Sequence, residues 1–113
     1  FRLAAKILKG HKVHEDVRLL ITPSSRTVLL KMLEEGLVDI FVKAGGALVT
    51  AGCGACVGVH AGILGDDEVC LSTQNRNFCG RMGNTKGNIY LCSPAVAAYS
   101  AIKGHIADPR EVL

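Results

Sequence analysis

The fold of this chain is decided by the segment from Val17 to Ser25, which reads VRLLITPSS. Its apolar first half predicts a short buried strand, and the Thr22-Pro23 step ends that strand. Either Ser24 or Ser25 then offers a hydroxyl that can cap a following helix. A strand that leads directly into a helix is the unit from which α/β domains are built.

The same alternation continues on both sides of this segment. Apolar residues at helical spacing predict a first helix that stops at Gly10, namely Leu3, Ala4, Ile7 and Leu8. Further helices are expected at about 26–35, 37–43 and 95–103, and strands at 47–50, 68–72 and 89–92. The expected apolar stripe of the second helix is Val28, Leu29, Met32 and Leu33. The pattern predicts one α/β domain over residues 1–113, a three-layer domain with a mainly parallel sheet flanked by helices.

Composition limits the classes of function. The chain has 113 residues, of which 49% are hydrophobic and 20% charged, as in ordinary soluble domains. Its net charge of +3 is small and scattered, which argues against a nucleic-acid partner. The sequence contains neither a signal peptide nor an apolar run of about 20 residues, so no membrane association is expected. Five cysteines cannot all pair, and this favours free thiols in a reducing, cytoplasmic compartment.

The string GCGACVG at positions 52–58 follows a predicted strand and contains Cys53 and Cys56. Two thiolates at this spacing can converge on one metal or cluster, and the glycines allow the backbone to approach it closely. A zinc site would need two more ligands at similar spacing, which the sequence lacks. A [4Fe–4S] cluster needs only a third thiolate if its fourth iron binds water or substrate. Cys70, Cys79 and Cys92 are candidates, although each is more simply interpreted as a small packing residue.

The string NRNFCGR at positions 75–81 also follows a predicted strand. A guanidinium binds a carboxylate through two parallel hydrogen bonds and stays charged at any working pH. Two solvated surface arginines are the simpler interpretation of Arg76 and Arg81. The context supports a polar binding loop as well, because Asn75 and Asn77 flank Arg76 and Gly80 precedes Arg81. Together, thiolates and arginines predict metal-assisted chemistry on a small organic acid.

The histidines are weaker candidates. His11 and His14 lie in a polar segment and are expected to be solvated. His60 follows the Cys56 position by four residues and is expected to pack or to lie behind the metal ligands. His105 stands at a helix end, where a histidine is favourable through the helix dipole.

Three strings together resemble the aconitase superfamily, in particular its isopropylmalate dehydratase and homoaconitase branch. They are Gly52–Gly58, Ser72–Arg81 and Tyr90–Ala98, and the resemblance continues to the Asp108–Glu111 segment. It implies a [4Fe–4S]-dependent hydro-lyase that isomerises a hydroxy acid by dehydration and rehydration. The expected substrate is 2-isopropylmalate, in leucine biosynthesis, with a homoaconitase or another aconitase-type dehydratase as the alternative.

The resemblance also assigns roles to residues. Cys53 and Cys56 would be two of three cluster ligands, Asn75 would hydrogen-bond near the cluster, and Arg76 and Arg81 would hold substrate carboxylates. The third cysteine ligand is expected upstream of Phe1, and the catalytic base is expected on a small, swivelling subunit. No catalytic residue is therefore expected within these 113 residues.

These roles imply that the chain is the third domain of a longer large subunit. That subunit would pair with the small subunit in a heterodimer or a larger oligomer. The 113 residues alone are expected to be inactive.

Two other classes of function remain open. A strand followed by Cys53 and Cys56 also resembles a thioredoxin-like thiol oxidoreductase, in which a helix N-terminus lowers the pKa of the first thiol. Gly58 and Gly62 weaken the helix that this would need, and the arginine loop has no role in it. A non-catalytic module that binds metal or a partner subunit is the third class. Iron content separates the dehydratase from the thiol oxidoreductase, because the redox protein would be colourless.

Overall fold

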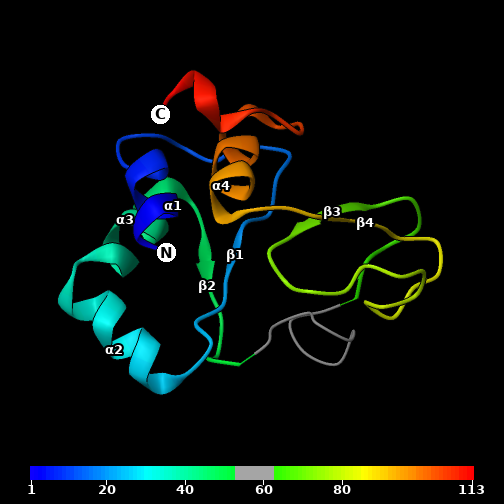
Figure 1. Cartoon of the computed structure of the whole chain (residues 1–113), viewed down its shortest axis with the longest axis horizontal. Helices are drawn as coiled ribbons and strands as arrows, with labels where there is room; N and C mark the ends of the chain where they lie inside the picture. The colour runs from blue at the N-terminus through cyan, green and yellow to red at the C-terminus, as the bar shows by residue number, and fades with distance from the viewer. Residues whose placement is uncertain (53–62) are drawn as a thin grey trace.

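The computed structural model describes residues 1–52 and 63–113, in which short helices alternate with short strands (Figure 1). In chain order the elements are α1 (Arg2–Leu8), β1 (Leu20–Ile21), α2 (Arg26–Glu34), α3 (Leu37–Ala44), β2 (Ala47–Leu48), β3 (Val69–Ser72), β4 (Asn88–Leu91), α4 (Pro94–Lys103) and the 3₁₀ turn η1 (Pro109–Glu111). The predicted helices and strands are all present, and the α/β prediction is confirmed. None of the described helices is of the length and apolarity that crossing a membrane requires.

The strands form two separate parallel pairs in the described part of the chain, where one larger sheet was predicted. In one pair Leu20 lies opposite Ala47, and in the other Val69 lies opposite Asn88. In Figure 1, β1 and β2 run among the helices, whereas β3 and β4 lie in a separate lobe. The molecule therefore has a helical lobe, which contains β1 and β2, and a β3–β4 lobe.

A proline follows the β1–β2 ladder at its carboxyl end, and the pairing stops at Ile21 and Leu48. The carbonyls of Leu19 and Ile21 accept hydrogen bonds from the amides of Ala47 and Val49, at 2.8 and 3.0 Å. The next donor on that edge of β1 would be position 23, where Pro23 has no N–H. The predicted strand 17–21 was right in place and at its end, but it started three residues too early, since pairing begins at Leu20.

Two serines begin helices by capping them. The Ser25 hydroxyl accepts a hydrogen bond from the Val28 amide at 3.2 Å, which decides between the two serines predicted for this role. Ser93 caps α4 in the same way, accepting from the Val96 amide at 3.2 Å, and Pro94 occupies the first helical position.

The core lies where α1, α3 and α4 meet. Its most deeply buried side chains include Leu8, Met32 and Phe41, each no more than 2% exposed. Three residues of the predicted apolar stripes lie outside it: Leu29 is only half-buried, Leu3 is 44% exposed and Leu33 is 54% exposed. The reason is that α1 packs on α3 and α4 through its other face, while α2 packs mainly on α3.

His14 lies against the end of α4 while its side chain remains 39% exposed, so it is partly solvated, as expected, and also makes contacts within the fold. Its amide donates to the Ala101 carbonyl at 2.8 Å, and its Nδ1 accepts from the Asp16 amide at 3.1 Å. Gly104, which ends α4 at a φ of 82°, lies against the imidazole; a Cβ there would come within 2.7 Å of the ring. His14 thus joins the segment before β1 to the end of α4.

Leu8→Ala is expected to lower the free energy of unfolding by about 3 kcal/mol, because it opens a cavity in the core. Leu33→Ala, the same substitution at an exposed helical position, is expected to change it by less than about 1 kcal/mol. Urea unfolding followed by circular dichroism measures both. Equal losses in the two variants would contradict the packing described here.

Candidate functional site

The loop that follows β3 contains Asn75, Arg76 and Arg81, the residues predicted to bind substrate. It begins at Ser72, which is 7% exposed and whose hydroxyl accepts a hydrogen bond from the Gln74 amide at 3.1 Å. The Ser72 carbonyl accepts from the Cys92 amide at 2.9 Å, so the loop starts at the paired end of β3. Asn75 and Arg76 follow directly and are exposed.

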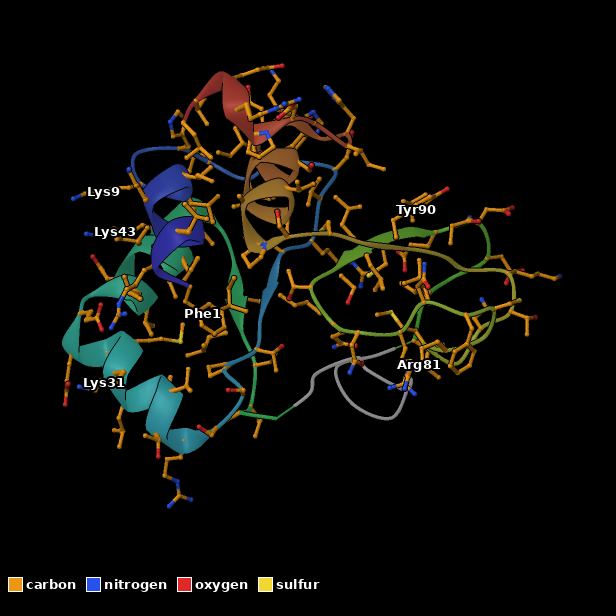
Figure 2. All side chains as sticks on the ribbon, viewed as in Figure 1. Phe1, Lys9, Lys31, Lys43, Arg81 and Tyr90 are labelled. Atoms are coloured by element: carbon orange, nitrogen blue, oxygen red, sulfur yellow. The ribbon has the colours of Figure 1, made fainter. Side chains whose placement is uncertain are left out.

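Arg81 is held more firmly than Arg76. Its amide donates to the Phe78 carbonyl at 2.9 Å, and its guanidinium carbon lies 5.7 Å from the centre of the Phe78 ring. A cation over an aromatic face is attracted by the ring quadrupole. Arg81 is half-buried, and Figure 2 shows it on the opposite side of the β3–β4 lobe from Tyr90. Phe78 is a member of the site that the sequence reasoning missed, although an aromatic three residues before an arginine could have indicated it.

Two further residues of the loop hold its shape. The Asn77 side-chain amide donates to the Ile89 carbonyl on β4 at 3.4 Å. The Cys79 thiol donates to the Thr85 carbonyl at 3.4 Å. Asn77 therefore ties the loop to its neighbouring strand, and Cys79 closes the turn that contains Gly80 and Gly83, whose φ angles are 81° and 93°.

Cys53, Cys56 and His60 lie outside the described residues. The structure does describe the residue just before them. The Gly52 amide donates a hydrogen bond to the carbonyl of the buried Pro23 at 2.8 Å. Pro23 comes just after β1, and Gly52 comes just after β2. The cysteine string therefore starts where the carboxyl ends of two parallel strands meet, the edge at which ligands bind in α/β sheets.

The other cysteines have the character of packing residues. Burial raises the pKa of the Cys70 thiol, and the nearby Glu68 carboxylate raises it further. Burial also raises the pKa of the Cys92 thiol. Both shifts disfavour the thiolate, which is the form in which a cysteine binds a metal. Among residues 1–52 and 63–113, no three His, Cys, Asp or Glu side chains are grouped closely enough to bind a metal.

Two hollows lie elsewhere on the surface. One, of about 520 Å³, lies between the start of α2 and residues 49–51, next to the beginning of the cysteine string. The other, of about 450 Å³, lies between β1, β3 and α4. Neither is lined by Asn75, Arg76 or Arg81, although Met82, next to Arg81 in the same loop, lines the second.

Comparison with known proteins decides the family. The sequence pattern of the aconitase family (aconitate hydratase) matches residues 1–104. The chain belongs to the aconitase family. The resemblance inferred from the cysteine and arginine strings is thereby confirmed at the level of the family.

Individual members of the aconitase family match almost the whole chain. It is 70% identical over 112 residues to a 3-isopropylmalate dehydratase large subunit of Elusimicrobium minutum, covering 99% of this chain and 27% of the relative. It is 62% identical over 111 residues to a large subunit of the same name from Archaeoglobus fulgidus, covering 98% and 27%. A methanogen homoaconitase large subunit of Methanocaldococcus jannaschii is 56% identical over 107 residues, covering 95% and 26%. The chain spans about a quarter of the length of these aconitase-family relatives.

Proposed function

We propose that this chain is the third domain of a 3-isopropylmalate dehydratase large subunit, a hydro-lyase of leucine biosynthesis in the cytoplasm. One observation supports this most directly. Two loops with complementary chemistry, a cysteine pair and an arginine pair, follow parallel strands in a chain that matches large subunits of that name at up to 70% identity. Homoaconitase is the second candidate, because a homoaconitase large subunit is 56% identical.

In this proposal Cys53 and Cys56 supply two of three thiolates to a [4Fe–4S] cluster. The described cysteines fit that assignment. Burial raises the pKa of the Cys70 and Cys92 thiols, and the Cys79 thiol donates to a backbone carbonyl. The third thiolate would come from another part of the large subunit. When bound, the cluster supplies a Lewis-acidic iron that polarises the substrate hydroxyl.

The residues of the loop after β3 bind and orient the acid. Arg81, positioned by the Phe78 ring, and the exposed Arg76 each offer a planar fork of N–H donors to a carboxylate. Asn75, directly beside Arg76, offers an amide that can donate to a third oxygen. A substrate held at two carboxylates has its hydroxyl-bearing carbon fixed between them, and such orientation accounts for much of an enzyme's rate enhancement.

The proton that leaves with the hydroxyl needs a base that these residues do not provide. An arginine stays protonated and an asparagine side chain is not basic, so the loop can bind the acid without deprotonating it. The proposal therefore assigns the base to a small partner subunit. Isolated residues 1–113 are expected to have no dehydratase activity.

The test is turnover by the complete large subunit expressed with its small subunit under anaerobic conditions. Ultraviolet absorbance of the unsaturated intermediate reports the loss of water from 2-isopropylmalate. Homocitrate, assayed in parallel, separates the two candidate functions. Faster turnover of homocitrate would replace the first candidate by the second, and no turnover of either acid by an iron-loaded complex would contradict both.

A further inference from the structure

One asparagine side chain, that of Asn84, joins the segment before β3 to the segment before β4. Its amide nitrogen donates to the Leu64 carbonyl at 2.8 Å and to Asp66 Oδ1 at 3.0 Å. Its amide oxygen accepts from the Lys86 amide at 2.9 Å. The nitrogen and the oxygen of this side chain are thus both engaged. We call these four residues the Asn84 clasp.

Backbone contacts bring the same two segments together. The Asp67 amide donates to the Lys86 carbonyl at 2.9 Å, and Asp67 has a φ of 60°. This left-handed conformation is uncommon for a residue other than glycine, and it persists only where neighbouring contacts hold it. Gly87 lies against Leu64, since a Cβ at Gly87 would come within 2.9 Å of the leucine side chain. The clasp is therefore closed by its backbone as well as by Asn84.

The clasp holds the base of the turn that contains Arg81. The Cys79 thiol donates to the Thr85 carbonyl at 3.4 Å, which closes this turn beside Asn84. Met82, which is 2% exposed, anchors the turn through apolar burial. Apolar contacts have no preferred direction, whereas hydrogen bonds do. The hydrogen bonds of the clasp therefore orient the turn that Met82 anchors.

The other half of the clasp belongs to the first described segment after the cysteine string. Leu64 follows Cys56 by eight residues in the sequence. The clasp is thus a direct contact between the chain that comes from the cysteines and the loop that carries Arg81. In the proposed function one acid contacts both the cluster and the arginines. A misplacement of about 1 Å between such groups can lower a rate by about 100-fold.

We infer that Asn84 is a positioning residue, which orients Arg81 relative to the cysteine string without touching the substrate. The inference rests on the proposed function. Two acceptors, at 2.8 and 3.0 Å from one nitrogen, require a side-chain NH₂ group. Asparagine has this group, and aspartate, which has the same shape, lacks it.

Asn84→Asp in the complete large subunit, assembled with its small subunit, tests the inference. The change puts a carboxylate against the Leu64 carbonyl and the Asp66 carboxylate, so the clasp opens. We expect kcat/KM to fall by about 10-fold while the iron content per chain stays unchanged. Asp66→Asn in the same chain returns a donor to the pair at the original net charge. This exchange is expected to bring kcat/KM back to within about threefold of the unmodified enzyme.

A double-mutant cycle with Arg81→Lys separates positioning from general stability. If Asn84 acts through Arg81, Asn84→Asp lowers kcat/KM by less than about twofold in the Arg81→Lys enzyme, because effects through a shared group do not add. Tyr99→Phe is the matched control, since it removes one hydrogen bond, to Glu111 at 2.6 Å, from the helical lobe. We expect it to change kcat/KM by less than about twofold.

The assay uses whichever of 2-isopropylmalate and homocitrate the unmodified enzyme turns over. Failure of the proposed function is therefore seen in the unmodified enzyme, whereas failure of this inference is seen only in the variants. Unchanged kcat/KM or loss of iron in Asn84→Asp would overturn the inference. An equal fold-loss with and without Arg81→Lys, or no recovery on adding Asp66→Asn, would overturn it as well.

Discussion

Cys53→Ser in the complete enzyme is expected to abolish cluster binding and to lower dehydration of 2-isopropylmalate by about 10³-fold or more. A serine hydroxyl is not deprotonated at neutral pH, so a cluster held by three thiolates loses one of its ligands. Loss of the Lewis-acidic iron removes several kcal/mol of transition-state stabilisation, and each 1.4 kcal/mol is about tenfold in rate. Iron and sulfide per chain and the visible absorption of the cluster measure binding independently of activity.

Cys79→Ser is the matched control for this prediction. The Cys79 thiol donates to the Thr85 carbonyl at 3.4 Å, and a serine hydroxyl can donate there as well. We expect iron content and turnover close to those of the unmodified enzyme. Loss of iron in the Cys79 variant with retention in the Cys53 variant would reverse the assignment. Absence of iron from both, with a reversible Cys53–Cys56 disulfide, would favour the thiol oxidoreductase.

Arg81→Lys is expected to lower kcat/KM for 2-isopropylmalate by about 100-fold while leaving the iron content unchanged. Lysine keeps the charge but loses the planar fork that binds a carboxylate bidentately, and it stacks less well on the Phe78 ring. Losing one partner of a desolvated, hydrogen-bonded charge pair costs roughly 2–5 kcal/mol. Steady-state kinetics on the assembled enzyme measures the effect.

Arg110→Lys carries the same substitution to an exposed arginine, whose guanidinium bonds to Asp108 at 2.6 Å. We expect a change in kcat/KM of less than about twofold, because exposed ion pairs are worth little. Equal effects at Arg81 and Arg110 would mean that Arg81 acts through general stability and does not bind the substrate.

The order of helices and strands was predictable from the sequence because it depends on local signals. Ser25 and Ser93 cap their helices, and glycines end α3 and α4, all within a few residues of the elements they bound. The start of β1 was less predictable, since it depends on where the pairing with β2 begins. The exposure of Leu3 and Leu33 depends on which helices pack together, and periodicity within one helix does not contain that information.

The candidate site was predictable in its chemistry and less so in its arrangement. The arginine and cysteine strings indicate the kind of ligand, because residue type alone determines charge and metal affinity. The folded loop and its burial determine the contact between Arg81 and Phe78, the hydrogen bond from Asn77 to Ile89 and the raised pKa of the Cys70 thiol. The division of the strands into two pairs could not be predicted from the sequence. Alternating helices and strands predict that the strands are parallel, but not which strand lies beside which.

The Phe78 ring under Arg81 has a consequence for the entropy of binding. An arginine in water samples many rotamers, and ordering such a side chain at an interface costs roughly 0.5–1.5 kcal/mol. The Arg81 guanidinium already lies 5.7 Å from the ring centre before any anion arrives. Part of its rotamer freedom is therefore lost when the chain folds, and less remains to be lost on binding. Phe78 would thus raise the affinity of the loop for an acid by preorganising its cation, without contacting the acid itself.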